Sequence, residues 1–443
     1  MKPHNILLIL VDDLHWSNVG AYGSDFFETP SLDRLAREGW RFTDGYSAAP
    51  ICSASRAGIL TGCSPARLGF EFVSKPPDAE GPHHTKLRQP PHVAELASGL
   101  PTLGDAMRRA GYVTGHIGKW HLTQQHDRYL GYGKVNGPAQ RGFDVVEEDR
   151  GAHPCNYAER GLGNYAEGEF PPDASSQAAV RFIHDHKGKP FFLKFASYFP
   201  HVPVHSPCGW LLDKYRKKSG GKADEKRVAF GAFIETMDHY IGHVLDALDE
   251  AGLTENTLVW FVSDHGGEPP HAPGPPLRGS KWTLYEGGIR TPVLMRWPAH
   301  LAAGRVESTP VGGLDIMPTL CALTGQAAPE GQDGCDLSPL LLNQEPGVRA
   351  APLFWHFPFY HPTKGCYEGT TPCSALRREH WKLIHFHEDQ RSELYDLEQD
   401  IGETRDLARV RPDLLVELED ELFTLLNERG ARFPEPNPAY LDF

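Results

Sequence analysis

Two apolar segments, far apart in the chain, are each followed by side chains that could bind a metal ion. Residues 6–11 and 257–262 are largely apolar, and the polar side chains that follow them are Asp12, Asp13, Asp264 and His265. Such runs are typical of central strands that are buried on both faces and carry functional groups at their carboxyl ends. Three carboxylates and an imidazole form a hard, oxygen-rich ligand set, which favours Ca²⁺ or Mg²⁺. The sequence therefore predicts a site for one divalent cation.

A second candidate for chemistry is a cysteine with an arginine four residues further on. The segment Cys52-Ser53-Ala54-Ser55-Arg56 is followed directly by Ala-Gly-Ile-Leu-Thr-Gly. It resembles the signature of type I sulfatases, although the family usually has Pro where this chain has Ala54. The resemblance implies that a formylglycine-generating maturation enzyme oxidises Cys52 to formylglycine, whose hydrated aldehyde is the nucleophile. A buried cysteine at the start of a helix is the structural alternative.

Further segments resemble blocks of the same family, occur in the same order and extend the resemblance over most of the chain: residues 29–42, 118–122, 264–266 and 281–292. The resemblance implies an α/β protein with the alkaline-phosphatase-like fold, a large mixed sheet flanked by helices with a smaller C-terminal α+β domain. It also implies that the divalent cation is Ca²⁺, with Mg²⁺ as the alternative. The ligands would be the four residues at the strand ends.

The resemblance also assigns roles to basic residues around the nucleophile. Arg56 and Lys119 would hold the hydroxyls of the hydrated aldehyde, and His121 would accept a proton when the aldehyde is restored. Lys281 and His201 would bind the sulfate oxygens, and His201 would protonate the leaving oxygen. Attack on an anionic sulfate ester needs such positive charge and proton donors. The implied activity is hydrolysis of a sulfate monoester.

Two other functions remain open from the sequence. His265 stands where many sulfatases carry Asn, and a His there is also found in relatives that cleave phosphonate or phosphate esters. A phosphonate monoester or phosphodiester hydrolase on the same scaffold is therefore the first alternative. Asp13 favours sulfate, because those relatives tend to have a non-acidic residue at that position. A non-catalytic binder of sulfated ligands is the second alternative, and it conflicts with a complete set of catalytic residues.

The rest of the chain predicts alternating helices and strands. The expected helices are residues 30–38, 102–110, 176–186 and 228–248, and the expected strands are 5–11, 41–46, 112–117, 190–198 and 257–262. This alternation is typical of α/β proteins. Strands at 381–387 and 393–397 and a helix at 412–426 predict a small C-terminal unit. We therefore expect a catalytic domain over residues 1–341 and a small-sheet subdomain over residues 342–443.

Charge, hydropathy and cysteine content limit the classes of partner and the cellular location that the sequence favours. The net charge is −14, from 58 acidic and 44 basic residues, and no dense Lys/Arg run is present, so nucleic acid is not an expected partner. The longest apolar run, residues 6–11, is too short to span a membrane, and no signal-like segment follows Met1, so we expect a cytoplasmic protein without a membrane partner. Eight cysteines are too few for a disulfide scaffold. Cys366 and Cys373 are close enough in sequence to bridge a loop, but two reduced thiols are favoured, and the sequence does not decide whether they pair.

The substrate is expected to be a small sulfated molecule, and a saccharide is favoured. The aromatic and histidine residues that suggest a sugar lie in one C-terminal segment: Trp355, His356, Phe359, Tyr360 and His361. Loops at residues 75–91 and 266–276, rich in Pro, Gly and His, are expected to cover the site. Substrate specificity is expected to lie in loops 76–91, 157–171 and 355–373. Glu286 and Arg290 are expected to form a structural ion pair beneath the site.

Overall fold

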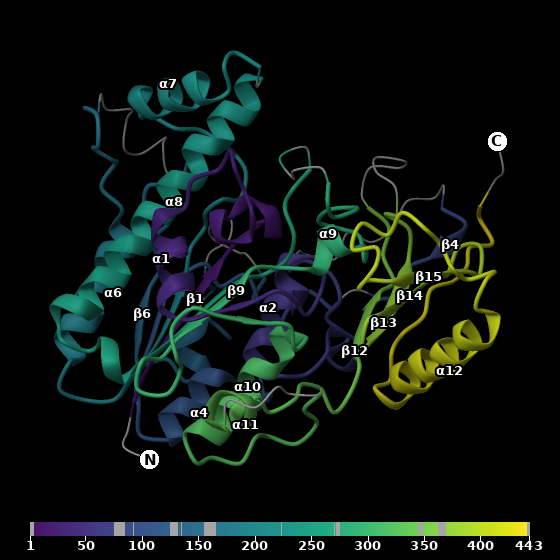
Figure 1. Ribbon diagram of the computed structural model, residues 1–443. Coiled ribbons are helices and arrows are strands. Elements are labelled where there is room, and N and C mark those ends of the chain that lie inside the picture. The colour runs from purple at the N-terminus through teal and green to yellow at the C-terminus, as the bar shows by residue number, and fades with distance from the viewer. Residues whose placement is uncertain are drawn as a thin grey trace.

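The structure, a computed structural model, describes residues 4–74, 85–91, 93–124, 132–133, 135–154, 165–222, 224–269, 271, 275–343, 349–361 and 369–440. Its centre is a mixed sheet of eight strands (Figure 1). In spatial order the strands are β10 (Arg305–Glu307), β2 (Trp40–Phe42), β9 (Val293–Arg296), β8 (Thr257–Ser263), β1 (Asn5–Val11), β7 (Phe191–Ala196), β5 (Val113–Gly118) and β6 (Val145–Glu147). Strand β1 is parallel to β7 and β8, and β5 is parallel to β7, so these four strands end at the same edge.

Strand β1 lies between two hydrophobic cores because its side chains alternate between the faces of the sheet. Leu7, Ile9 and Val11 pack into the core formed with α1 (Pro30–Glu38), α6 (Ala174–His186) and α8 (Glu225–Glu250). Residues 6, 8 and 10 pack into the core on the other face. The helices of that face are α2 (Cys52–Thr61), α4 (Leu103–Arg109), α10 (Ile316–Leu323) and α11 (Ser338–Asn343). The result is a three-layer α/β arrangement.

A smaller antiparallel sheet lies beside the large one, on the right in Figure 1. Its strands, in order, are β12 (Leu353–Phe357), β13 (Cys373–Arg378), β14 (Trp381–Phe386) and β15 (Arg391–Asp396). Helix α12 (Pro412–Glu428) covers one face through Leu418, Leu422 and Leu426. The other face packs against residues around α2 and α9 (Glu286–Ile289), so the small sheet supports segments of the large domain.

The remaining elements are short. Helix α7 (Gly209–Lys218) packs on α8, and α3 (Pro65–Leu68) lies beside α2 and β12. Two pairs of short strands join distant segments: β3 (Gly45–Tyr46) with β11 (Val311–Gly312), and β4 (Leu87–Arg88) with β16 (Glu435–Pro436). Single 3₁₀ turns occur at Trp16–Asn18, Gly20–Tyr22, Pro138–Arg141, Thr254–Asn256 and Gly313–Asp315. No helix in the described part of the chain is long and apolar enough to cross a membrane.

Every predicted helix and strand has a counterpart, but the single strand expected over residues 41–46 is wrong. The segment forms β2 and β3, which belong to different sheets. Between them the chain bends at Thr43 and Asp44. The Asp44 carboxylate binds Arg290 at 3.2 Å and Arg377 at 2.6 Å, so this residue is drawn into ion pairs instead of continuing the strand.

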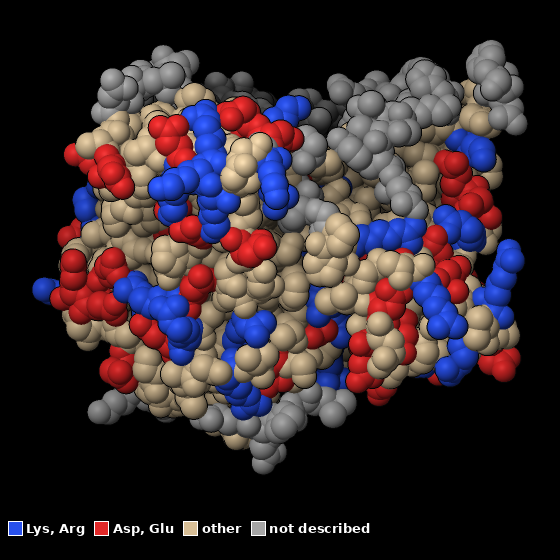
Figure 2. Space-filling view, turned by 45° about the horizontal axis from the view of Figure 1, so that its top comes forward, with Lys and Arg blue, Asp and Glu red and all other residues tan. Residues whose placement is uncertain are grey.

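On the face shown in Figure 2, Lys and Arg side chains lie beside Asp and Glu side chains. Ion pairs at the surface include Arg216 with Glu225 at 2.8 Å and Lys218 with Glu28 at 2.8 Å. Partly exposed pairs of this kind contribute little to stability. They neutralise basic charge locally in the segment around α7, which is the most basic stretch of the chain.

Candidate active site

The predicted site residues converge at one edge of the large sheet. Asp12 and Asp13 follow β1, Lys119 and His121 follow β5, and the segment after β7 carries His201. Asp264 and His265 follow β8. Because these strands are parallel and adjacent, residues far apart in sequence meet where the strands end.

Helix α2 brings Cys52 and Arg56 to the same place. Cys52 is its first residue, and Arg56 lies one turn later on the same face of the helix. All ten residues of α2 are buried, including the Arg56 guanidinium. Arg56 Nε donates to Asp264 Oδ2 at 2.9 Å, Nη1 donates to the Lys119 carbonyl at 3.1 Å, and Nη2 lies 3.6 Å from Asp12 Oδ1. Arg56 therefore links the helix to three strand ends.

Four of these side chains offer a pocket for a cation. Ligand atoms of Asp12, Asp13, Cys52 and His265 all lie within 4.8 Å of one another, and all four residues are buried. Asp12 Oδ1 has no hydrogen-bond partner among the described residues, while its other oxygen binds Lys119 Nζ. A buried carboxylate oxygen without a partner is costly unless a ligand satisfies it. The carboxylate oxygens of this set fit a hard divalent cation.

Asp264, the fourth predicted metal ligand, lies at the same place with both oxygens engaged. Its Oδ1 accepts the backbone N–H of Asp13 at 3.2 Å, and its Oδ2 accepts the Arg56 bond. The same Oδ1 lies 3.6 Å from His265 Nε2. Since a carboxylate oxygen has two lone pairs, either oxygen can keep its present partner and also bind a cation.

The contacts of His265 fix which nitrogen is available. Its Nδ1 lies 2.8 Å from the Gly266 carbonyl, so Nδ1 carries a proton and donates it. Its Nε2 lies 3.1 Å from Asp13 Oδ1 and 3.2 Å from Cys52 Sγ. Although burial alone would lower it, Asp264 and Cys52 raise the pKa of His265 to about 10. A metal at Nε2 would replace the proton that this raised pKa favours.

The three carboxylates differ in their ionisation. Burial alone would raise all three pKa values, but Lys119 holds the pKa of Asp12 well below its usual range, and Lys281 lowers that of Asp13. Burial and the neighbouring Asp12 charge raise the pKa of Asp264. Like charges in one site separate pKa values in this way, and a bound cation would relieve the repulsion.

Two site residues have a left-handed backbone. Asp13 has φ of 66° and His121 has φ of 60°. Non-glycine residues in this region cost about 1–3 kcal/mol and are enriched at functional sites. Asp13 lies just beyond the end of β1, and His121 lies just beyond the end of β5. Other described non-glycine residues, among them Asn136, Glu379 and Gln390, also have a positive φ, so this kind of strain is not confined to the site.

Of the two predicted catalytic histidines, His121 is buried and His201 is partly buried, and the pKa of each is lowered. Burial and Lys119 hold the pKa of His121 well below its usual range, and its Nδ1 is buried with no partner among the described residues. Burial also lowers the pKa of His201 to about 4. His201 Nδ1 donates to the Val202 carbonyl at 2.6 Å, which leaves Nε2, 3.9 Å from Asp13 Oδ2, as its free nitrogen.

Lys281 joins the site from a loop after β8. Its Nζ lies 3.0 and 2.9 Å from the two oxygens of Asp13 and 2.6 Å from Glu268 Oε2. Glu268 was missed by sequence analysis because its loop shows no periodic pattern. His153, which was also missed, bonds the His201 carbonyl through Nε2 at 2.7 Å. Glu268 could have been suspected because it is an ionisable residue in a loop that was expected to cover the site.

A second cysteine shares the spacing of Cys52, so the spacing alone does not identify the nucleophile. Cys63 has Arg67 four residues further on, with Pro65 between them. The Cys63 thiol lies 3.3 Å from the Gly331 carbonyl, and Arg67 binds Asp333 at 2.7 Å. Cys63 follows the end of α2, whereas Cys52 begins it. The structure therefore separates the two cysteines and brings only Cys52 to the strand ends.

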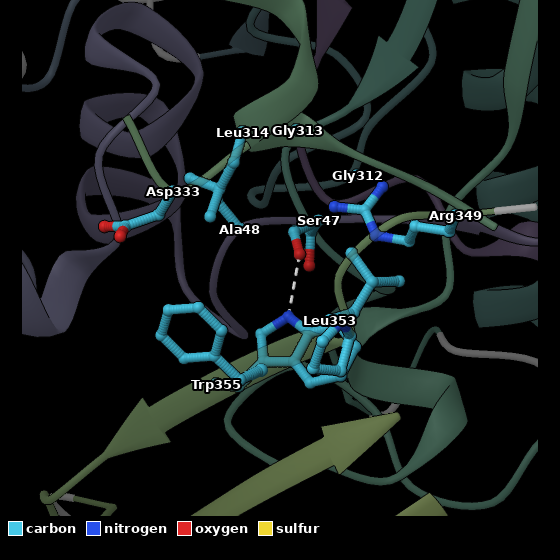
Figure 3. Close-up of a pocket in the computed structure, with 11 residues that line it drawn as sticks. Ser47, Ala48, Gly312, Gly313, Leu314, Asp333, Arg349, Leu353 and Trp355 are labelled. Atoms are coloured by element: carbon cyan, nitrogen blue, oxygen red, sulfur yellow. Dashed lines mark hydrogen bonds between the residues drawn. The ribbon is translucent and has the colours of Figure 1, made fainter. Parts of the chain in front are cut away.

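Four of the five residues that suggested a sugar site are buried, and the fifth, His361, is partly exposed. Trp355, His356, Phe359 and Tyr360 are buried, and Trp355 lies on β12. Trp355 Nε1 donates to the Ser47 carbonyl at 2.8 Å, beside a cavity of about 10 Å³ that has room for about one water molecule (Figure 3). Trp355 and Phe359 belong to the apolar cluster between the small sheet and the large domain, because apolar surface on both is buried there. His356 instead packs beside Phe433, and its Nε2 lies 3.1 Å from the Arg432 carbonyl.

The expected loops are only partly described. Residues 75–84, 155–164 and 362–368, which include Cys366, lie outside the described residues, while Cys373 is a free buried thiol. The predicted ion pair is present: Arg290 Nη1 lies 3.0 Å from Glu286 Oε2.

The fold and the site define a hydrolase of the alkaline-phosphatase-like class, with a metal pocket and a nucleophile position at the edge of a mixed sheet. A sulfatase sequence profile matches residues 4–326, and the profile of the C-terminal part of N-sulphoglucosamine sulphohydrolase matches residues 280–428. The chain therefore belongs to the sulfatase family and is a sulfuric ester hydrolase. The second profile begins before residue 341, so the predicted domain boundary there stays a prediction.

Individual relatives agree with this family. N-acetylgalactosamine-6-sulfatase of Canis lupus familiaris is 33% identical over 80% of this chain and 69% of its own length. Arylsulfatase A of Homo sapiens is 32% identical over 94% of this chain and 86% of its own length. The crystal structure of Ps i-CgsB with k-i-k-neocarrahexaose has a TM-score of 0.76 and 27% identity, covering 98% of this chain and 95% of that one.

Proposed function

We propose that this sulfatase cleaves a sulfate monoester on a small carbohydrate, using formylglycine formed from Cys52 by a maturation enzyme. The observation that supports this most directly is the position of the Cys52 thiol. It begins a buried helix, lies 3.2 Å from His265 Nε2 and has the Arg56 guanidinium one turn away. In the proposed mature enzyme, the hydroxyls of a hydrated aldehyde would replace this sulfur atom.

The bound cation is proposed to be Ca²⁺, with Mg²⁺ as the alternative, held by Asp12, Asp13, Asp264 and His265. It would supply positive charge that offsets the charge of the sulfate group and of the attacking oxygen. The hydrated aldehyde would supply one hydroxyl as the nucleophile and a second whose deprotonation releases sulfate. Release restores the aldehyde, so no separate water has to attack sulfur.

The residues around Cys52 are suited to hold these groups. Arg56 and Lys119 are buried cations whose charge faces Asp12 and Asp264, so their positions are fixed before substrate enters. His121 is neutral and can take up the proton of the second hydroxyl. Lys281, already held by two carboxylates, would bind a sulfate oxygen.

His201 is proposed as the acid that protonates the leaving oxygen. In the substrate-free arrangement its Nε2 is unprotonated, because Nδ1 donates to the Val202 carbonyl. The negative charge of a bound sulfate ester would raise the pKa of His201, and the ring could then donate a proton from Nε2. The proton goes to the oxygen of the alcohol as its bond to sulfur breaks.

The carbohydrate part of the proposal is supported by the relatives rather than by a pocket of this chain. One relative is an N-acetylgalactosamine-6-sulfatase, and one structural neighbour was crystallised with a neocarrahexaose. A phosphonate ester is a second candidate substrate because of His265. The phosphonate monoester hydrolase of Agrobacterium radiobacter, at 20% identity and a TM-score of 0.70, shares the fold.

A substrate panel tests the proposal. Purified protein with a confirmed aldehyde at residue 52 would be assayed on sulfated mono- and disaccharides, an aryl sulfate and an aryl phosphonate. We expect kcat/KM to be highest for a sulfated saccharide and lowest for the phosphonate. A preference for the phosphonate would overturn the choice of ester, and a preference for the aryl sulfate would overturn the choice of a sugar.

A further inference from the structure

A buried ion cluster connects the small C-terminal sheet to the active-site loops. Lys382 on β14 places its Nζ 2.8 Å from Glu286 Oε1 and 2.8 Å from Glu403 Oε1. All three side chains are fully buried. Glu286 begins α9, and Glu403 follows β15. Lys382 therefore pairs with one carboxylate of the large domain, Glu286, and with one of the C-terminal part, Glu403.

The same glutamate from the C-terminal part fixes the start of α9. Glu403 Oε2 accepts the backbone N–H of Glu286 at 2.7 Å. The Glu403 carbonyl accepts Arg278 Nη1 at 3.1 Å, and that nitrogen also donates to Tyr395 Oη at 2.9 Å. Both ends of the segment 278–286, which contains Lys281, are thus attached to residues 395–403.

Helix α9 in turn holds the residue next to His265. The N–H of Gly266 donates to the Gly288 carbonyl at 2.9 Å, and the N–H of Gly287 donates to the Arg278 carbonyl at 2.7 Å. A Cβ on Gly266 would lie 1.9 Å from the Gly287 carbonyl oxygen, so the two backbones are in direct contact. The N–H of Lys281 donates to the Gly267 carbonyl at 3.0 Å. A shift of α9 would therefore move the backbone on both sides of the site.

The electrostatics make this arrangement depend on Lys382. Although burial alone would raise it, Lys382 and Arg290 lower the pKa of Glu286, whereas burial raises the pKa of Glu403. Removing one partner of a buried ion cluster leaves an uncompensated charge, which costs far more than the cluster contributes. Glu286 would keep Arg290 at 3.0 Å, but the described contacts give Glu403 no other cation.

We propose that Lys382 and Glu403 are positioning residues for the active site: they fix α9, and α9 fixes the backbone that carries His265 and Lys281. Neither residue lies at the site itself. The inference rests on the proposed roles of His265 and Lys281. It assigns the small sheet a function in metal binding and substrate binding.

Two variants and one control test the inference. Lys382→Met removes the cation, and Glu403→Ala removes the acceptor for the first N–H of α9 while keeping the Lys382–Glu286 pair. The control is Arg349→Met, which breaks a different buried ion pair, with Asp315 at 2.6 Å. Calcium affinity would be measured by titration of each folded protein with CaCl₂, and hydrogen exchange would be measured in peptides spanning residues 264–290.

We expect both test variants to bind Ca²⁺ about 10–100-fold more weakly, because supporting contacts of metal ligands have effects of this size. Exchange in residues 264–290 should become faster in both. Arg349→Met should lose stability without either change. The inference is overturned if Glu403→Ala binds Ca²⁺ with wild-type affinity and shows unchanged hydrogen exchange in residues 264–290. It is also overturned if Arg349→Met changes both quantities as much as the test variants do. Hydrogen exchange can be measured without bound metal and without turnover, so it tests the inference independently of the proposed function. A wild-type protein that binds no Ca²⁺ would contradict the proposed function but not the exchange result.

Discussion

The backbone N–H of Asp13 donates a hydrogen bond to Oδ1 of Asp264, a residue 251 positions away in the sequence. This bond joins the ends of β1 and β8 just where both strands leave the sheet. Because Asp13 has a left-handed backbone, its N–H points to Asp264 while its carboxylate faces His265 and Lys281. One bond thus fixes the relative positions of the residues proposed to hold the metal.

Replacing Asp264 should therefore remove the metal and loosen the site together. We expect Asp264→Ala to lose bound Ca²⁺ by elemental analysis and to lose turnover, because the cation ligand and the acceptor for the Asp13 N–H both disappear. Chelation of the wild-type protein should abolish turnover as well. Full metal occupancy in Asp264→Ala would remove this residue from the ligand set.

The modification of Cys52 can be tested against a cysteine with the same spacing. Cys52→Ala should keep the fold and metal but lose turnover, since an aldehyde can no longer form. Cys63→Ala is the matched control and should keep turnover, because Cys63 lies away from the strand ends. Peptide mass spectrometry should show the mass loss of thiol-to-aldehyde conversion at residue 52, with a species that reacts with hydrazides. Full activity from a preparation whose Cys52 is wholly unmodified would falsify the mechanism.

The role of His201 predicts a dependence on the leaving group. His201→Ala should lower kcat/KM for a sulfated sugar by about 10²–10⁴-fold, the usual contribution of a general acid. An activated aryl sulfate, whose phenolate leaves without protonation, should be affected much less. Rates for both substrates in wild type and variant give the comparison. Equal losses for the two substrates would mean that His201 binds or orients substrate but does not act as the acid.

The small sheet should be sensitive to acid. Ser374 Oγ links two buried imidazoles, at 2.7 Å from His356 Nδ1 and 2.8 Å from His387 Nε2. The ring of His387 also packs beside Phe423, Phe433 and the ring of His385. His385 in turn lies 3.4 Å from Glu419. Burial lowers the pKa of His387 to about 3. The unfolded chain therefore takes up a proton below pH 6.5 that the folded chain does not, and stability falls as pH falls from 6.5 towards 3.

At pH 5 this group should account for a loss of about 2 kcal/mol. We expect His387→Gln to lose less stability than wild type between pH 7 and pH 5, by about that amount, in urea unfolding at each pH. His184→Gln, at an exposed position on α6, is the control and should retain the wild-type pH dependence. Burial raises the pKa of Glu403 and of Asp238 to about 7 and acts in the opposite direction. Their contribution cancels when variant and wild type are compared.

The central strands and the polar side chains that follow them could be predicted because their signals are local. An apolar run followed by aspartates identifies β1 and β8 without knowledge of their neighbours. The four-residue spacing of Cys52 and Arg56 places both on one face of a helix, but Cys63 and Arg67 have the same spacing. Only the packing of α2 against the strand ends distinguishes the two pairs, and sequence spacing does not predict this packing.

The residues that sequence analysis misplaced owe their position to distant partners. Trp355 was expected in a loop over a sugar, but its ring is buried against Ser47, 308 residues earlier. Removing residues 355–373 should therefore unfold the small sheet rather than change substrate affinity alone. Lys382 meets Glu286 across 96 residues. The type of an apolar or charged residue indicates that it will be buried or paired, but a single sequence does not identify the residue that it contacts.

The burial of α2 has a consequence for the timing of synthesis. Cys52 is 2% exposed in the folded protein, so an enzyme that modifies it must act while the helix is still open. Ile51 and Ala54, on either side of Cys52, pack in one cluster with Trp355 and Phe357. These partners leave the ribosome about 300 residues after Cys52, which at about 5–20 residues per second takes roughly 15–60 s. The late position of the small sheet in the chain thus leaves an interval in which the nascent cysteine stays accessible.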